Sequence, residues 1–269
     1  MKRALSMAAL GLGGLAMAYP FVWMVATAFK TLPESLNPAG PLLPAAWQWR
    51  NLTLTFEAAP FGRYFLNSLF VSLAAGGAVA ATSLLAGYAF ARLEFRGRNL
   101  LFGVLLATMM VPFELTFIPN FVTITRLGWY NTYAALIVPW CASPFGIFLV
   151  RQAFLAMPPD LFDAAQLDGC GHLRFLRHAG VALVRPALAA IFLFAFLGSY
   201  NALLWPLVVT SESSMRVVQV GLAAFVLDSG VRLNLLMCAS MVVILPGMLL
   251  YLFTQRFFDD QALRSGLKG

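Results

Sequence analysis

The sequence has little charge. Only 11% of its 269 residues are Asp, Glu, Lys or Arg, against roughly 25% in soluble domains, whereas 61% are hydrophobic. This shortage of charge excludes an ordinary soluble domain. It indicates a membrane protein.

Cysteine and histidine are also scarce. Two of the three cysteines, Cys141 and Cys238, fall in apolar runs and Cys170 falls in an expected cytoplasmic loop, so no disulfide is expected. The two histidines, His172 and His178, are six residues apart, a spacing that does not place them on one face of a helix. We therefore expect no metal site.

The scarcity of lysine excludes one kind of nucleotide site. None of the three lysines, Lys2, Lys30 and Lys268, follows a glycine-rich loop of the GxxxxGK[ST] kind. If the protein works with ATP, a separate chain must bind the nucleotide. We expect neither an enzyme active site nor a cofactor in this chain.

Long apolar runs are what the sequence has in abundance. A bilayer core of about 30 Å requires about 20 apolar helical residues. Six stretches qualify, approximately residues 4–29, 66–91, 100–123, 132–151, 184–206 and 233–255, the third with the acid Glu114 inside it. These stretches are too long and too uniformly apolar for barrel strands. We predict an all-α polytopic protein with six transmembrane helices in a single transmembrane domain, residues 1–269.

The first apolar run shares features with a signal peptide. Basic residues follow Met1, and Ala16-Met17-Ala18 resembles a cleavage site. The run continues to Phe29, however, beyond the roughly 7 to 15 residues of a signal peptide's apolar region. We expect an uncleaved first span.

Basic residues are unevenly divided between the two sides of the membrane. If the N-terminus is cytoplasmic, twelve lysines and arginines lie on the inner side and six on the outer side. The positive-inside rule then predicts that both termini are cytoplasmic. Because the basic residues are scattered over short loops, no nucleic-acid partner is expected.

Two of the segments between spans are long. The outer one, residues 30–63, contains five prolines, which argue against a continuous helix. The inner one, residues 152–183, contains Pro158 and Pro159, which cannot continue the preceding helix. A break is predicted there.

A short helix is predicted after this break. Asp160 is placed to cap it, Asp163 occupies the capping-box position, and the helix runs to about Leu167. Gly169 and Gly171 then allow a sharp change of direction. A second short helix follows, with three candidate apolar contacts, Leu173, Phe175 and Leu176.

The face of the first short helix has two alternative interpretations. Spacings of three and four place four residues on one side of it: Leu161, Ala164, Ala165 and Asp168. The alanines make this side flat, which suits close approach to another protein. Alternatively, the segment lies among lipid headgroups, with Arg174 and Arg177 near anionic lipids. The spacing alone does not decide between them.

The run Asp163-Ala164-Ala165-Gln166-Leu167-Asp168-Gly169 resembles the EAA motif of ATP-binding cassette importer permeases. The motif differs at Asp163, where Glu is usual, and Ala182 stands where a proline is common. Further stretches resemble the carbohydrate-uptake branch, of the maltose-permease and glycerol-phosphate-permease type, across nearly the whole chain; they are YFLNSLFVSL, AGYAFARLEFRGR, MMVPFELTFIPNF, LGWYNTYAALIVPW, SYNALLWPLVVT and QRFFDDQALRSGLKG.

This resemblance implies a function and a set of partners. It assigns Asp163, Ala164, Ala165, Asp168 and Gly169 to a coupling helix that docks on a separate ATPase, which holds ATP and Mg. Two ATPase copies, a second permease subunit and an extracytoplasmic solute-binding protein are the implied partners. The implied solute is a sugar, polyol or sugar phosphate. The implied location is a bacterial or archaeal cytoplasmic membrane, where the chain contacts lipid.

Five residues in the spans are candidates for a substrate pathway: Glu114, Asn67, Tyr200, Asn201 and Trp205. A charge inside a span is expected to face a cavity or a partner. The alternatives are that Glu114 lies near the outer end of its span, that Asn67 caps the second span, and that the aromatic side chains serve interface or packing. Pro112 and Pro119 are expected to kink the third span.

Two other functional classes remain open at this point. A secondary transporter would require further ion-coupling residues within the spans. A membrane-embedded enzyme would require nucleophiles, acids or metal ligands gathered at one depth, and the predicted spans contain no such cluster. The sequence does not identify the solute, the ATPase or the second permease.

Overall fold

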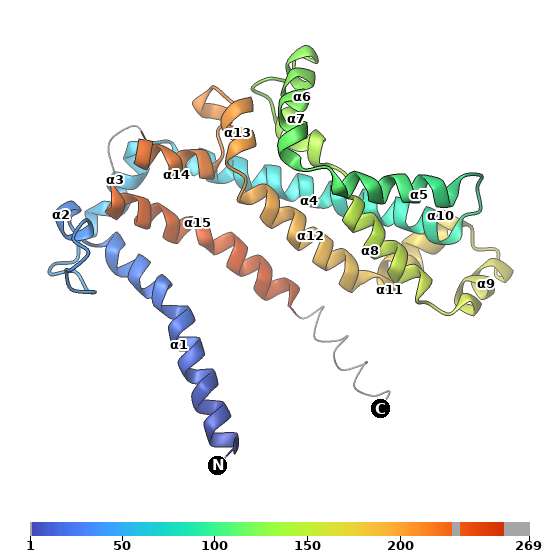
Figure 1. Cartoon of the computed structure of the whole chain (residues 1–269), viewed down its shortest axis with the longest axis horizontal. Coiled ribbons are helices and arrows are strands. Elements are labelled where there is room, and N and C mark those ends of the chain that lie inside the picture. The colour runs from blue at the N-terminus through green and yellow to red at the C-terminus, as the bar shows by residue number, and fades with distance from the viewer. Residues whose placement is uncertain (1, 228–231, 256–269) are drawn as a thin grey trace. The chain divides into compact units, whose positions relative to one another are not determined.

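The computed structural model describes residues 2–227 and 232–255, and Figure 1 follows the chain through its helices. Every regular element within these residues is helical, and no strand occurs among them. The prediction of an all-α protein is confirmed. Three of the twelve basic residues expected on the inner side, Arg256, Arg264 and Lys268, lie outside the described residues.

The helices fall into two compact units. The first unit comprises the chain up to Leu66 together with Arg216–Pro246. It contains α1 (Lys2–Ala28), α2 (Leu32–Ser35), α3 (Arg50–Ala58), the start of α4 (Phe61–Arg92), α14 (Val218–Leu227) and most of α15 (Leu233–Thr254).

The second unit comprises Asn67–Met215 and the chain from Gly247. After α4 it contains α5 (Arg98–Ala107), α6 (Phe113–Arg126), α7 (Tyr133–Ile137), α8 (Pro144–Leu155), α9 (Pro159–Leu167), α10 (His172–Phe175), α11 (Val181–Leu183), α12 (Arg185–Tyr200) and α13 (Leu204–Val209). Three 3₁₀ turns, at Thr108–Met110, Val138–Trp140 and Ser213–Met215, and one π-helical turn, at Leu176–Gly180, complete it.

Three helices of the described chain are long and apolar enough to cross a membrane: Leu5–Ala28, Phe61–Arg92 and Leu233–Thr254. Three further stretches qualify only as bent pairs of helices. The bends are 101° between Arg98–Met110 and Phe113–Arg126, 43° between Tyr133–Trp140 and Pro144–Leu155, and 80° between His172–Leu183 and Arg185–Tyr200. The predicted stretches 100–123 and 132–151 are therefore not single straight helices, and the stretch 184–206 is divided between α12 and α13.

Proline explains the sharpest of these bends. Pro112 lacks a backbone N–H, and its ring forces the preceding residue out of the helical region; Val111 accordingly has φ −83° and ψ 114°. The chain turns there, and α6 starts at Phe113 (Figure 1). Pro119, by contrast, lies within α6. The predicted kink is confirmed at Pro112.

The proline-rich segment after α1 forms two short helices rather than one continuous helix, as predicted. Thr31 and Glu34 form a reciprocal capping box at the start of α2. Asn51, buried on α3, donates its amide hydrogens to the carbonyl oxygens of Ala28 (2.8 Å) and Lys30 (2.9 Å). These contacts fix the first unit's short helices to the C-terminal end of α1.

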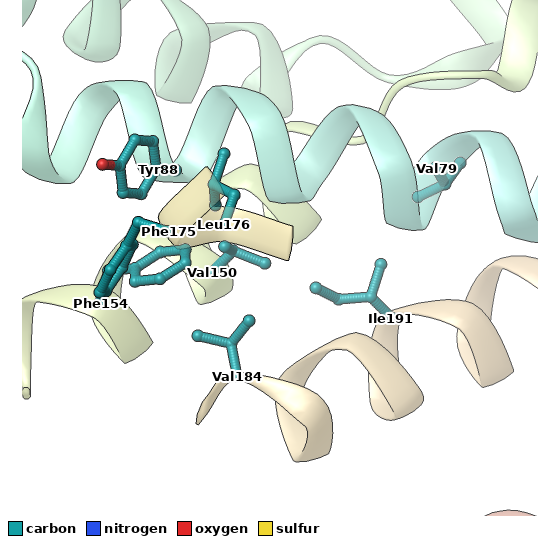
Figure 2. Close-up of a cluster of buried hydrophobic side chains, with 8 residues drawn as sticks. All are labelled: Val79, Tyr88, Val150, Phe154, Phe175, Leu176, Val184 and Ile191. Atoms are coloured by element: carbon teal, nitrogen blue, oxygen red, sulfur yellow. The ribbon is translucent and has the colours of Figure 1, made fainter. Parts of the chain in front are cut away.

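The core of the second unit lies among α4, α8, α10 and α12. Tyr88, Val150, Phe154, Phe175 and Val184 are buried in it (Figure 2). The helices α4 and α8 approach closely because Gly87 has no side chain: a Cβ there would lie 2.7 Å from Cβ of Val150. This core supports the segment in which the sequence predicts a coupling helix.

Candidate functional site

The short helix α9 begins two residues earlier than predicted. Pro159 occupies its first position, where a missing N–H is harmless and a φ near −65° suits the helix. Asp160 therefore lies inside the first turn, and Pro158 is the N-cap, with no side-chain cap. The expectation that Asp160 caps the helix, with Asp163 completing a capping box, is wrong, because proline initiates the helix instead. Asp160 still lies where the helix dipole favours an anion.

The C-terminal end of α9 is closed by Gly169. Its φ of +72° is a left-handed conformation that favours glycine. The N–H of Gly169 donates to the carbonyl oxygen of Gln166, and the N–H of Cys170 donates to that of Ala165, both at 2.9 Å. This pair of bonds is a Schellman motif. Gly171, by contrast, has a φ of −69° and serves as the N-cap of α10.

An aromatic cluster holds the inner side of α9. Phe162 of α9 lies edge-on to Phe175 of α10 (5.3 Å between ring centroids) and stacks on His172 (5.8 Å). Tyr88 of α4 lies edge-on to Phe154 of α8 (5.3 Å). In Figure 2, Tyr88, Phe154 and Phe175 gather at one end of the buried cluster. Aromatic pairs of this kind stabilise beyond the area they bury.

Polar contacts complete this support. The Tyr88 hydroxyl hydrogen-bonds His172 Nδ1 at 2.8 Å, which ties the start of α10 to α4. Arg92 donates from Nη2 to the carbonyl oxygens of Phe154 (2.9 Å) and Met157 (3.3 Å), which satisfies carbonyls at the end of α8. Its guanidinium also lies 5.7 Å from the centre of the Phe162 ring. The polypeptide on both sides of α9 is thus anchored to α4.

The outer side of α9 is free. Asp163, Ala164 and Asp168 are exposed, as are Leu161 (50%) and Leu167 (89%). Within the described chain, the side chains of Asp160, Asp163 and Asp168 have no hydrogen-bond or ion-pair partner. The result is an exposed acidic and apolar face on a firmly held helix.

The predicted face is partly wrong. Ala165 does not share the exposed side with Leu161, Ala164 and Asp168, because it packs against the buried cluster beside Phe162. In the second short helix, Phe175 and Leu176 are buried as predicted, whereas Leu173 is 75% exposed. Sequence reasoning also missed Tyr88, Arg92 and Phe162.

Three of the five substrate-pathway candidates are buried, and their side chains contact other residues of this chain. Asn67 lies well inside α4, so the alternative that it caps this helix is wrong. Its amide donates to the carbonyl oxygen of Ser214 (2.8 Å) and accepts from the Tyr133 hydroxyl (2.7 Å). Trp205 donates from Nε1 to the carbonyl oxygen of Ala135 (2.9 Å). Tyr200 stacks on Phe196, 5.5 Å away.

The other two candidates are exposed. Glu114 lies in the first turn of α6, directly after the bend at Pro112. Its carboxylate has no hydrogen-bond or ion-pair partner among residues 2–227 and 232–255. Asn201 is the C-cap of α12. These two side chains remain accessible, in contrast to Asn67, Tyr200 and Trp205.

Nothing in the described residues suggests a metal centre, since no three His, Cys, Asp or Glu side chains gather there. His172 is engaged by Tyr88, and His178 Nδ1 lies 2.9 Å from the carbonyl oxygen of Arg174.

Known proteins resemble this chain over most of its length. Residues 81–262 match the family described as the binding-protein-dependent transport system inner membrane component. An arabinooligosaccharide transport permease from Halalkalibacterium halodurans is 32% identical, covering 93% of this chain and 91% of its own. A diacetylchitobiose uptake permease from Streptomyces coelicolor is also 32% identical, covering 94% and 85%.

A solved structure has the same fold. The permease chain of a bacterial ABC transporter that imports the acidic polysaccharide alginate superimposes with a TM-score of 0.82 at 21% identity, covering 95% of each chain. This shared fold agrees with the family match and with the sequence relatives. The chain belongs to the binding-protein-dependent inner membrane components, as a permease subunit of the carbohydrate-uptake branch of ATP-binding cassette importers.

Proposed function

We propose that this chain carries a sugar, polyol or sugar phosphate into the cytoplasm, and that a separate ATPase drives it by pushing on α9. The relatives support a polyhydroxylated solute, because their names refer to arabinooligosaccharides, diacetylchitobiose and sn-glycerol-3-phosphate. The chain itself is a transport subunit, and ATP and Mg belong to the ATPase.

One observation carries the proposal: α9 is exposed on one side and fixed on the other. Its acids have no partner in the described chain, whereas Phe162 and the flanking residues pack on Tyr88 and Phe175. A force applied to the exposed side would therefore reach α4 through rigid contacts. The assignment of Asp163, Ala164, Ala165, Asp168 and Gly169 to ATPase docking rests on this arrangement, with Ala165 contributing from the inner side.

The proposed topology has six spans and both termini in the cytoplasm; the first two bent pairs count as one span each, and α12 forms the fifth span without His172–Leu183. Residues 152–183 then lie on the cytoplasmic side, where an ATPase is available. Residues 30–63 lie outside, where a solute-binding protein docks. A solved relative, an alginate transporter in complex with a pentasaccharide-bound periplasmic protein, supports such a partner, at a TM-score of 0.64 and 14% identity.

The complete importer is proposed to contain a second permease subunit and two ATPase copies in a bacterial or archaeal cytoplasmic membrane. Within this chain, exposed Glu114 and Asn201 are the proposed pathway contacts. Three buried residues are proposed to support the helices that line the pathway without touching the solute: Asn67, Tyr200 and Trp205.

Purification of the tagged chain from its native membranes tests this function. We expect a second permease and an ATP-binding cassette ATPase to co-purify. Asp163→Lys should lose the ATPase and retain the second permease, because it reverses a charge on the exposed face of α9. Asp163→Glu, which keeps the charge, should retain both. Recovery of the chain alone, with uptake in ATP-free vesicles, would overturn the proposal.

A further inference from the structure

A cavity of about 320 Å³ lies beside the C-terminal end of α1, within the first unit. Its lining includes Tyr19, Trp23, Thr27 and Lys30. The first three are four residues apart and Lys30 follows after three, so they form one stripe along α1 and the turn that ends it. Asn37 and Leu42, from the segment after α2, also line the cavity.

The polar end of the cavity has donors without acceptors. Lys30 is only 5% exposed, and its Nζ donates to the carbonyl oxygen of Pro41 at 2.6 Å. An ammonium group has three N–H donors, and the described residues supply no other acceptor for the remaining two. Thr27, one turn earlier, is 1% exposed, and its Oγ1 has no partner in the described chain. Buried polar groups of this kind are normally satisfied.

The nearest acid does not satisfy them. The carboxylate of Glu34 accepts hydrogen bonds from the backbone and hydroxyl of Thr31, both at 3.0 Å, and from the backbone of Ala45 at 3.2 Å. Glu34 is not among the residues that line the cavity. Glu34 attracts the Lys30 ammonium, but no carboxylate among the described residues forms an ion pair with it.

The apolar end points to an amphipathic ligand. Tyr19 is 57% and Trp23 is 36% exposed, on a helix apolar enough to span a membrane. Tyrosine and tryptophan are typical of the membrane–water interface, and a basic pocket at that depth attracts anionic headgroups. A phosphate offers several acceptor oxygens for the free N–H and O–H groups of Lys30 and Thr27, and a negative charge to pair with the Lys30 ammonium.

We propose that this cavity binds the phosphate of an anionic phospholipid, with Lys30 as the cation and Thr27 as the hydroxyl donor. Its volume accommodates the phosphate and the glycerol but not two acyl chains. The chains extend over Tyr19 and Trp23 along the apolar surface of α1. The site is independent of α9 and does not rest on the coupling proposed above.

Native mass spectrometry of the purified assembly, after exchange into detergent, measures the binding. Short-chain phosphatidylglycerol is titrated into the wild type, Lys30→Gln and Thr27→Val. Loss of a charge-assisted hydrogen bond predicts that Lys30→Gln binds the lipid about tenfold more weakly. Arg50→Gln is the matched control, because Arg50 is an exposed cation of the same segment outside the cavity. It should bind as the wild type does.

A second variant protects the test against misfolding. Leu42→Trp keeps every charge and places a larger side chain at the lining of the cavity, so it should also bind the lipid weakly. Equal lipid binding by the wild type, Lys30→Gln and Leu42→Trp would overturn the site. Competition by inorganic phosphate separates the two sources of the anion. If inorganic phosphate displaces the lipid at equal concentration, the site is for free phosphate and the lipid assignment fails.

Discussion

The two long segments between the apolar helices use their polar side chains in opposite ways. In residues 30–60, Glu34 caps α2 and bonds to Ala45, and Asn51 closes the end of α1. In residues 152–183, the acids of α9 have no partner within the described chain, and the segment is held by aromatic rings instead. A polar side chain that is hydrogen-bonded within the protein is unavailable to a partner. The segment that leaves them free is the one that we propose docks on the ATPase.

The strongest test of this contrast is Gly169→Val. A β-branched residue at φ +72° costs about 1–3 kcal/mol, so the end of α9 should rearrange and uptake should fall at least about tenfold. Transport assays in cells measure the loss. Gly171→Val is the control, because its φ of −69° accepts a side chain and no atom lies within 4 Å of the new Cβ. Equal uptake by the two variants would contradict the role of the Gly169 turn.

A smaller effect is expected from Phe162→Ala. Removal of this half-buried ring leaves Tyr88, His172 and Phe175 without their partner on α9, at a cost of about 2 kcal/mol. We expect ATPase activity to become less dependent on solute, measured in proteoliposomes. Leu173→Ala, in the same loop but 75% exposed, should change little. Undiminished coupling in Phe162→Ala would show that α9 needs no aromatic support.

In the outer segment, Asn51→Ala should lower thermal stability. The carbonyl oxygen of Ala28 loses its side-chain donor and that of Lys30 keeps only the 3.4 Å hydrogen bond from Asn234, which costs about 1 to 2 kcal/mol. The Tm should drop, whereas ATPase docking stays intact because α9 is untouched. Thr53→Ala is matched to it, since Thr53 is exposed on the same helix and bonds only to Arg50 of its own turn. A loss of docking in Asn51→Ala would break the contrast.

The smallest effect concerns Glu34. Hydrogen bonds from the backbone of Thr31, the backbone of Ala45 and the Thr31 hydroxyl hold the pKa of this exposed carboxyl below its usual value. A lowered folded-state pKa stabilises the fold above the unfolded pKa, and this stabilisation is lost as pH falls through the folded pKa. The Tm difference between wild type and Glu34→Gln should therefore be largest at neutral pH and vanish in acid. A constant difference would refute the capping role; Glu57→Gln is the control.

Sequence patterns correctly predicted the features that depend on residues close together in the chain, namely helix ends and long apolar helices. The prolines at 158 and 159 marked the start of α9, and Gly169 marked its end. The apolar composition identified the long helices, since burial in lipid and burial in protein both select apolar side chains. Asp160 was wrongly predicted to be the N-cap. An acidic residue favours the N-cap position and proline favours the first helical position, and here the helix begins at Pro159.

Contacts between distant residues could not be predicted in this way. Tyr88 meets His172 across 84 positions, and Arg92 meets Phe154 across 62. No periodicity or motif marks such a pair. Asn67 illustrates the same limit, because its amide looks available in sequence but is consumed by Ser214 and Tyr133. Whether a polar side chain is free depends on its neighbours in space.

The π-helical turn at Leu176–Gly180 has a consequence for how the segment that carries α9 joins α12. The N–H of Val181 donates to the carbonyl oxygen of Leu176, which lies five residues earlier in the chain instead of the four of an α-helix. One residue more than the α-helical repeat rotates everything after it by about 100°. Because α12 leaves this short helix at an angle of 80°, such a rotation changes the direction in which α12 runs. Deletion of a single residue here would swing α12 away from its packing on α8, with every side chain of α9 unchanged.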